Sequence, residues 1–164
     1  MQIGILADTH NRNGSLQAAL AYLSNNGIET IFHCGDVTSI ETARLMVGFT
    51  VHYVYGNGDA DANAIRDLLI SANPASTGGL VFSAELDGVS IAATHGHVTG
   101  KVIALAAGGT YTYVFHGHTH VQKDQMIGKT RVINPGSLGS YRYGGRTLCV
   151  LDLKTGVSEY PSFE

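Results

Sequence analysis

The sequence has no tryptophan, only three prolines and only two cysteines among its 164 residues. Cys34 and Cys149 both lie inside apolar segments, where a free thiol behaves as a small hydrophobic side chain, so they predict neither a disulfide framework nor a zinc finger. No apolar stretch reaches the roughly 20 residues needed to span a bilayer, and no basic segment followed by an apolar one opens the sequence. These absences predict a cytoplasmic protein with reduced cysteines and no membrane partner.

Charged side chains are also scarce, at 14% of residues, with 10 Lys and Arg against 13 Asp and Glu. A net charge of -3 without any basic run argues against a nuclease that acts on long nucleic acid. The chain is rich instead in apolar residues, at 44%, and in glycine, with 21 residues that favour tight turns and close backbone approaches. A length of 164 residues is enough to bury a proper core, and we expect a single domain over 1–164.

The first half of the chain repeats a pattern of apolar strand, polar loop and amphipathic helix. The three strands are expected at 2–7, 30–34 and 51–55. Polar residues suited to cap the helices that follow them are Ser15, Thr38 (with Glu41) and Asp61. Three such rounds predict a parallel core sheet, because a helix between two strands allows them to run in the same direction.

The pattern of the second half favours hairpins and mainly antiparallel pairing. Asp87-Gly88 between two apolar runs is a strong signal for a type I′ turn. Strand 80–86 of this hairpin is apolar and is suited to pairing across the interface of a homo-oligomer, although the sequence leaves the oligomeric state open. The other expected elements are a helix at 99–107, a strand at 111–115, and hairpins at 121–127 with 130–133 and at 147–153 with 157–160.

Several polar residues stand where an apolar run ends. The carboxyl ends of parallel strands share one edge of a sheet, and ligands of open α/β sheets bind there, so these side chains are expected to converge. Two of them, His118 and His120, alternate along an extended segment, which would place both rings on one side. The full set is Asp8, His10, Asp36, Asn57, His95, His118 and His120.

These seven side chains offer oxygen and nitrogen donors without thiolate. Such a set suits divalent ions from hard to borderline, with Mn²⁺ expected and Fe²⁺, Co²⁺, Ni²⁺ or Zn²⁺ as alternatives. There are more donors than a single ion needs. Two ions about 3.5 to 4 Å apart that share one carboxylate would use them all, and this arrangement is typical of phosphoryl hydrolysis.

The order and rough spacing of five motifs resemble those of the calcineurin-like metallophosphoesterases, in particular their small bacterial and archaeal phosphodiesterase branch. The motifs are Asp8-Thr9-His10, Gly35-Asp36, Gly56-Asn57-Gly58-Asp59, His95-Gly96 and Gly117-His118-Thr119-His120. The segment Asn134-Pro135-Gly136-Ser137 also resembles the loop that closes this branch. The resemblance implies an α/β fold in which two mixed β-sheets pack as a sandwich with helices on the outside, in four αββα layers.

The resemblance also implies a role for each donor. One ion would be held by Asp8, His10, Asp36 and His120, and the other by Asp36, Asn57, His95 and His118, which makes Asp36 the bridge. The implied function is a metal-dependent phosphoesterase, favouring phosphodiesters, whose two ions activate water for in-line attack on the phosphorus of a small phosphate ester. Asp36, Asn57 and His95 would act catalytically through metal-bound hydroxide and phosphate contact.

For several other polar residues, the sequence allows either a role at the site or a purely structural role. Arg12 is a phosphate clamp or a solvated loop residue, and His97 touches substrate or supports a neighbouring ligand. His33 and His52 alternate with apolar residues inside strands, which favours packing roles. The segment Tyr141-Arg142-Tyr143 is either a pocket wall or an exposed loop end.

One position departs from the family pattern, because Gly58 stands where the larger phosphatases carry a histidine that helps the leaving group depart. This departure leaves His97 and His116 as the nearby substitutes for an acid. The alternative function is a non-catalytic protein-binding scaffold on the same fold, as in a trafficking subunit that resembles the family. Loss of ligands would favour the scaffold, and no ligand position is lost here.

Overall fold

The computed structural model describes residues 1–142 and 144–163, which form two β-sheets and four α-helices. The strands of the first sheet are β1 (Gln2–Leu6), β2 (Thr30–His33), β3 (Thr50–Val54), β4 (Thr77–Gly79), β10 (Cys149–Asp152) and β11 (Ser158–Glu159). Those of the second are β5 (Val81–Leu86), β6 (Val89–Thr94), β7 (Tyr113–Phe115), β8 (Lys123–Ile127) and β9 (Thr130–Asn134). The helices are α1 (Asn13–Asn25), α2 (Ile40–Arg44), α3 (Ala62–Ala72) and α4 (Lys101–Ala107).

The first sheet has the strand order β11-β10-β1-β2-β3-β4. Strands β1 to β4 run parallel, as the repeated strand and helix pattern predicts, and β10 joins the free edge of β1 in the antiparallel sense. The short strand β4 was not predicted, because the sequence Thr77-Gly78-Gly79 has no apolar pattern and glycine disfavours strands. The carboxyl ends of β1, β2 and β3 therefore share one edge.

The second sheet has the order β5-β6-β7-β9-β8 and is mixed rather than mainly antiparallel. Its central strands β6, β7 and β9 run parallel, and the hairpin partners β5 and β8 are antiparallel edge strands. The predicted hairpins β5–β6 and β8–β9 are confirmed, and so are the two mixed sheets. The parallel pairing of β6, β7 and β9 was missed because α4 turns the β6 to β7 connection into a crossover, which local hairpin signals do not reveal. The type I′ turn is confirmed, with φ of 51° at Asp87 and 76° at Gly88.

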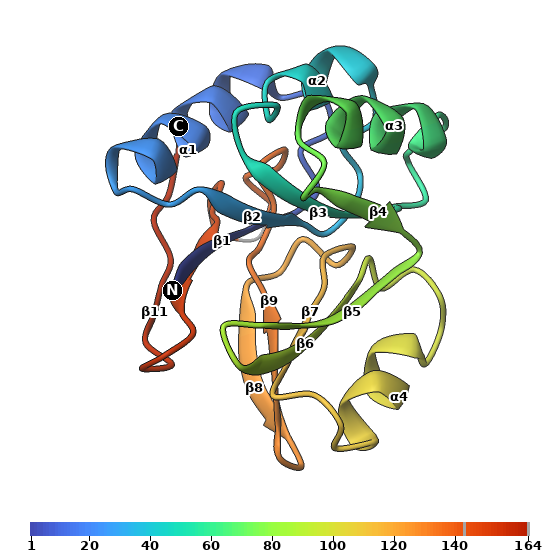
Figure 1. The fold of residues 1–164 in the computed structure, drawn as a ribbon, viewed down its shortest axis with the longest axis vertical. Helices are drawn as coiled ribbons and strands as arrows, with labels where there is room; N and C mark the ends of the chain where they lie inside the picture. Colours follow the sequence, from blue (N-terminus) through green and yellow to red (C-terminus); the bar gives the residue numbers. More distant parts are fainter. Residues whose placement is uncertain (143, 164) are drawn as a thin grey trace.

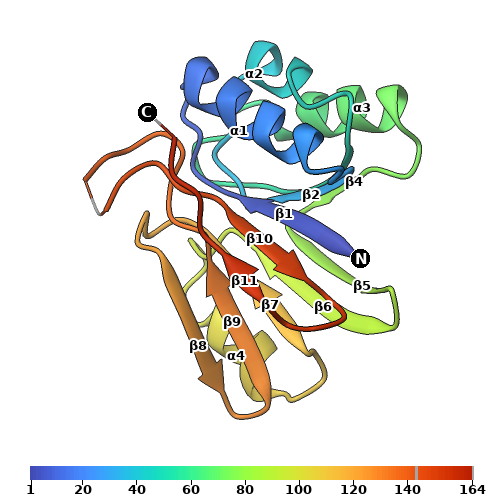
Figure 2. The ribbon, with the colours of Figure 1, turned by 90° about the vertical axis from the view of Figure 1, so that its left-hand side faces the viewer.

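The layers follow the predicted αββα order (Figure 1). Helices α1, α2 and α3 cover the outer face of the first sheet, and α4 covers the outer face of the second (Figures 1 and 2). Between the sheets, Phe32 packs edge-on against Phe82 and against Phe115, with ring centroids 5.0 Å apart in both pairs. This shared apolar layer fixes the position of one sheet against the other. Strand β5 lies at an edge of the second sheet, and its pairing with a second copy stays a prediction.

Two helix caps differ from the predicted ones. Ser15 lies inside α1 and is buried, and the cap of α2 is Ser39, whose Oγ accepts the N–H of Thr42 at 3.2 Å. Thr38 adopts a left-handed φ of 77°, whereas Ser39 has the extended backbone that a capping residue needs. Asp61 occupies the position before α3 but makes no capping hydrogen bond.

The two cysteines are free and buried, as expected. Burial raises the pKa of the Cys149 thiol to about 12, which keeps it protonated and inert at neutral pH. Within 1–142 and 144–163, none of the helices has the length and apolar character required to cross a bilayer.

His52 makes the stability of the fold sensitive to acid. Its ring packs between Phe32 and Phe82, at centroid distances of 4.9 and 4.6 Å, and its Nδ1 lies 3.0 Å from Thr77 Oγ1. Burial lowers the pKa of His52 from 6.5 to about 4. The unfolded chain therefore binds more protons than the folded chain between these values, so the free energy of unfolding decreases as the pH falls from 6.5 towards 4.

We expect this contribution to reach roughly 3 kcal/mol at the acid end of the window, since each unit of pKa shift corresponds to about 1.4 kcal/mol. Replacing the residue with glutamine (His52→Gln) removes the titrating group at similar volume. Urea unfolding at pH 7.5 and pH 5.0 should show a smaller acid-induced loss of stability in the variant than in the natural protein. An identical loss in both proteins would show that His52 does not carry this effect.

Candidate metal centre

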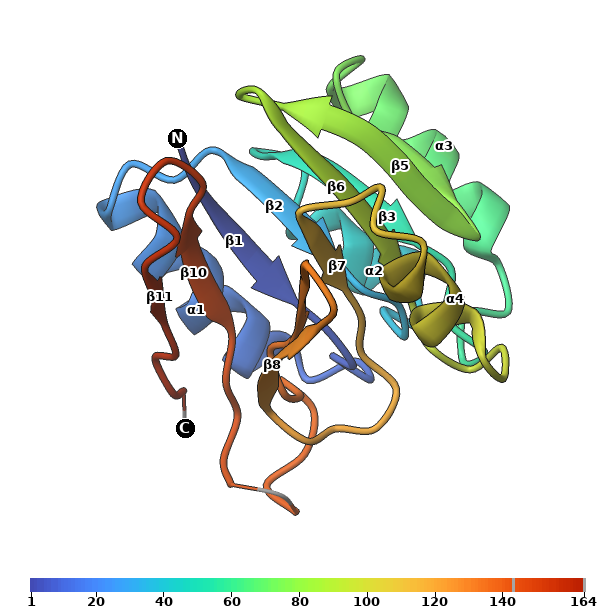
Figure 3. The ribbon, with the colours of Figure 1, turned by 90° about the horizontal axis from the view of Figure 1, so that it is seen from below.

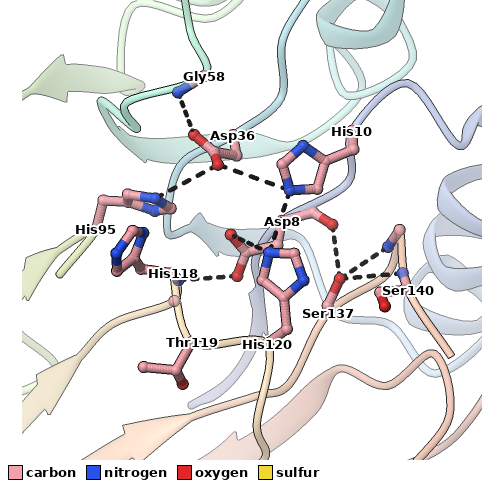
Figure 4. Close-up of polar contacts among 12 residues, drawn as sticks. Asp8, His10, Asp36, Gly58, His95, His118, Thr119, His120, Ser137 and Ser140 are labelled. Carbon is pink, nitrogen blue, oxygen red and sulfur yellow. Dashed lines mark hydrogen bonds and ion pairs between the residues drawn. The ribbon is translucent and has the colours of Figure 1, made fainter. Parts of the chain in front are cut away.

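The predicted donors lie in loops that follow five strand ends, at one edge shared by both sheets (Figures 3 and 4). Backbone hydrogen bonds tie these loops together. The N–H of Asp8 donates to Gly35 O at 3.0 Å, and the N–H of His10 donates to Asp36 O at 3.0 Å. Between the loops that follow β6 and β7 of the second sheet, Gly117 N–H donates to His95 O at 3.0 Å. The convergence that the strand ends predict therefore occurs.

Asp8, His10 and His120 form one compact group, with one ligand atom of each within 4.8 Å of the others. The Nε2 atoms of the two histidines face each other at 3.2 Å, and His120 Nε2 lies 3.4 Å from Asp8 Oδ1. That carboxylate oxygen is buried, and among the described residues it accepts no hydrogen bond. A buried oxygen of this kind is costly unless a proton or a cation satisfies it, so this part of the site fits a metal ion.

Asp36 lies between this group and His95 (Figure 4). Its Oδ2 is 3.6 Å from His10 Nε2 and 3.5 Å from His95 Nε2, and its Oδ1 accepts the N–H of Gly58 at 2.7 Å. Asp8, Asp36 and His95 form a second compact group, again within 4.8 Å. Asp8 thus takes part in both groups, whereas the family resemblance implied that only Asp36 would be shared.

Asn57 and His118 complete the set from the more exposed side of the site. Asn57 Oδ1 lies 3.1 Å from His95 Nε2, and the His118 ring packs against the His95 ring with centroids 5.0 Å apart. The backbone N–H of His118 also donates to Asp8 Oδ2 at 2.9 Å. All seven donors that the sequence singles out therefore lie together, five of them in the two compact groups.

The proximity of carboxylates and imidazoles shifts the pKa values of both. Burial alone would raise the pKa of Asp36, but hydrogen bonds from His95 and the Gly58 N–H outweigh it and lower the pKa to about 2. The pKa of His120 is raised, chiefly by its interaction with Asp8. Burial would lower the pKa of His95, but Asp36, Cys34 O and Asp8 together outweigh that effect and raise it. A bound cation would replace these protons, so metal binding here should release them.

The loops carry their donors on an unusual backbone. The segment from His118 to His120 is not extended, as the alternation of histidines had suggested, because both residues have a left-handed φ. Left-handed residues other than glycine are uncommon and cluster at functional sites, where surrounding contacts hold them. Five donors have this conformation, with φ of 54° at Asp8, 46° at His10, 58° at Asp36, 69° at His118 and 60° at His120.

Asp59 supports the Asp36 loop, a role that the sequence analysis did not assign. It is buried, and its Oδ2 accepts the N–H groups of Asp36 at 2.9 Å and of Gly56 at 2.8 Å. Its Oδ1 accepts the N–H of Thr38 at 2.7 Å. Three hydrogen bonds to one carboxylate fix the left-handed turn that presents Asp36. The feature of the sequence that could have indicated this role is an acidic residue two positions after the donor Asn57.

The loop after β9 supports the site from the other side. Asn134 Nδ2 donates to Gly117 O at 2.9 Å and to Thr119 Oγ1 at 3.0 Å. Ser137 Oγ donates to Asp8 O at 2.9 Å, as Figure 4 shows. These contacts explain why the segment from Asn134 to Ser137 accompanies the donor motifs in the sequence.

The remaining predicted residues lie outside the donor set. His33 is fully buried and belongs to neither donor group. Its Nε2 forms a hydrogen bond with Thr9 Oγ1 at 2.8 Å, and burial lowers its pKa to about 4. Arg12 is exposed just before α1 and lines a shallow cavity of about 330 Å³ with Arg146. Tyr141 packs under the Arg146 guanidinium at 3.8 Å, and Tyr143 lies outside the described residues.

Oxygen and nitrogen donors clustered where two packed mixed sheets meet form a candidate site for divalent metal ions. Residues 1–156 match the family model described as the calcineurin-like phosphoesterase superfamily domain, and the chain belongs to this family.

Known proteins of this type are similar over almost the whole chain. Phosphodiesterase MJ0936 of Methanocaldococcus jannaschii is 29% identical over 154 residues, which cover 93% of each chain. A solved structure of a novel archaeal phosphodiesterase has a TM-score of 0.91 at 28% identity and covers 98% of this chain and 99% of that chain. Vps29 of Chaetomium thermophilum has a TM-score of 0.73 at 14% identity, covering 98% and 93%, which is a likeness of fold alone.

Proposed function

We propose that the protein is a phosphodiesterase that uses two divalent metal ions, with Mn²⁺ as the preferred ion, to hydrolyse a small phosphate ester. The position of Asp36 carries this proposal, because its Oδ2 lies within 3.6 Å of donor nitrogens on both sides, His10 Nε2 and His95 Nε2. One carboxylate between two sets of donors is the arrangement that a pair of ions requires. The similarity to proteins named phosphodiesterases supports the choice of substrate class.

In this proposal each ion has four donors from the chain. One ion is held by Asp8, His10, Asp36 and His120, and the other by Asp36, Asn57, His95 and His118. When bound, the ions neutralise phosphate charge and provide a nucleophile for in-line attack by lowering the pKa of water.

The hydrogen bonds of His95 prepare it as a ligand. Its Nδ1 lies 2.7 Å from Cys34 O, and a carbonyl oxygen can only accept, so the ring proton is on Nδ1. In the neutral ring, Nε2 then presents a lone pair towards Asn57 Oδ1 at 3.1 Å and Asp36 Oδ2 at 3.5 Å. Three acceptors that face one another need a proton or a cation between them.

Other residues of the chain would bind and orient the ester. Asn57 uses its Oδ1 on the side of His95, which leaves its amide N–H groups to donate to a phosphate oxygen. Arg12 and His97 are the further substrate contacts that we propose, since a guanidinium matches phosphate oxygens in pairs and His97 packs beside His95 at 5.4 Å.

The alternative is a non-catalytic scaffold, and the likeness to Vps29 concerns the fold alone. A scaffold has no need for seven clustered metal donors, or for a buried Asp8 oxygen that accepts no hydrogen bond from the described residues. A screen of a phosphodiester, a phosphomonoester and a thioester with added Mn²⁺ distinguishes the two, because a scaffold hydrolyses none of them. We expect the diester to be preferred.

We predict that the folded protein binds two divalent ions per chain. The reason is that the two donor groups share one carboxylate, Asp8, so an ion in only one group leaves buried acceptors of the other group without a partner. Metal-free protein should be reconstituted with Mn²⁺, desalted and measured by elemental analysis, with circular dichroism to confirm an unchanged fold. A stoichiometry that never exceeds one ion per chain would contradict the two-ion proposal.

A further inference from the structure

A small cavity adjoins the metal centre on the side of β5 and β6. It has a volume of about 240 Å³. This is below the roughly 300 to 1,000 Å³ of sites that enclose a whole small molecule, but it is enough for one ring-sized group of a larger substrate. It is lined by Leu80, Val81, Thr94, His97, Val98 and Lys101.

His97 stands between this cavity and the metal centre. The His97 ring lines the cavity and packs against His95, with centroids 5.4 Å apart, and against His118 at 6.4 Å. The opposite wall is held in place by β5 and β6, where Val81 pairs with Thr94, the residue before His95. A phosphate ester at the donors would therefore have this cavity beside it.

The lining is apolar with a few polar groups. Leu80 is 62% exposed and Val98 49% exposed, so these two aliphatic side chains present apolar surface at the cavity. Lys101 is half-buried, and in the described part of the chain its ammonium has neither an ion pair nor a hydrogen bond. His97 Nδ1 is buried and likewise has no hydrogen-bond partner among the described residues.

We propose that this cavity binds one ester group of the substrate, a ring-sized apolar group that carries an acidic substituent. The aliphatic walls would cover the ring, and Lys101 would meet the substituent. The substrate class is thus a phosphate ester of an acidic aryl or similarly flat alcohol. This inference rests on the proposed function, because it assumes that the phosphate itself lies at the donors.

The test compares three simple monoesters as ligands, so it needs no turnover. Calorimetry with the Mn²⁺-loaded protein should show phenyl phosphate binding about 10-fold or more tightly than methyl phosphate, as expected for an apolar group that enters a fitting pocket. The 4-carboxyphenyl ester should bind up to about fivefold more tightly again at low salt, and this gain should shrink as salt is added.

Variants assign these gains to the cavity. Leu80→Ser and Val98→Ser should each remove most of the preference for phenyl over methyl while leaving methyl phosphate binding unchanged. Lys101→Met should keep the phenyl preference and lose only the gain from the carboxylate. Ile103→Ser is the matched control. Ile103 lies on α4, the helix of Lys101, and is 55% exposed, but it does not line the cavity.

Equal affinity for phenyl and methyl phosphate, or a phenyl preference that survives both serine variants, would overturn this inference. If phenyl phosphate is preferred as expected but no diester is hydrolysed with any metal, the proposed function fails and the cavity assignment stands. If none of the three esters binds, the cavity inference is overturned, and hydrolysis of a diester decides the proposed function separately.

Discussion

Asp36→Asn should reduce hydrolysis of a phosphodiester by about 10³-fold or more. The variant keeps a side-chain oxygen to accept the Gly58 N–H, which Asp36 Oδ1 now accepts at 2.7 Å, but it removes the charge between the two histidines at 3.6 and 3.5 Å. A bridging carboxylate holds two ions, and such ions stabilise the transition state by several kcal/mol. Each 1.4 kcal/mol of lost stabilisation lowers the rate about tenfold. The measurements are turnover and metal content per chain.

Comparison variants separate the bridge from a simple ligand. His120→Ala should also abolish turnover, yet keep about one ion, whereas Asp36→Asn should retain less than one. Asp67→Asn is the matched control, since Asp67 is an exposed partner of Arg66 at 2.8 Å on α3, and its turnover should stay within about twofold of the natural protein. Thermal unfolding confirms that each variant folds. Near-normal turnover in Asp36→Asn would mean that the bridge is assigned to the wrong residue.

That the donor side chains come together could be predicted from the sequence because of a general property of parallel strands. Asp8, Asp36 and Asn57 each follow a strand of one sheet, so their convergence needed only the strand direction. His95 and His118 follow strands β6 and β7 of the other sheet, and that these ends meet the first set depends on how the sheets pack. The packing came from the family resemblance and not from the hydrophobic pattern.

The finer structure of the site could not be predicted because it arises from long-range contacts. The left-handed backbone of His118 and His120 is held by hydrogen bonds to residues far away in sequence, such as Asp8 Oδ2 with the His118 N–H at 2.9 Å. Asp59 is another case, because its three backbone donors lie up to 23 residues away and no local pattern marks them.

Similar limits explain the errors in the fold. Strand β4 is held by its parallel partner β3 rather than by its own propensity, and β7, β9 and α4 form a crossover arrangement that local turn signals do not encode. By contrast, the Asp87-Gly88 turn was predicted correctly because two residues with positive φ are a local requirement.

The absence of a side chain at Gly58 bears directly on the leaving group. A Cβ at this position would lie 3.0 Å from Asp36 Oδ1, so Gly58 allows the bridge carboxylate to approach the loop closely. The same absence removes the histidine that larger phosphatases of the family carry there. Two nearby histidines are the remaining candidates for an acid, but burial lowers the pKa of His97 and of His116. Both imidazoles are therefore neutral at pH 7.5 and poorly suited to donate a proton.

The rate should consequently depend steeply on the pKa of the leaving alcohol. General acid catalysis contributes about 10²- to 10⁴-fold, so without an acid, aryl diesters such as nitrophenyl esters should react faster than alkyl esters by about this factor. A series of diesters with leaving groups of graded pKa gives the slope, measured in the natural protein and in His97→Ala and His116→Ala. An unchanged steep slope in all three supports a site without an acid. His116 Nδ1 already lies 3.1 Å from Gly117 O, so His97 is the more accessible candidate. A flat slope that becomes steep in one variant would reject the prediction and identify that histidine as the proton donor.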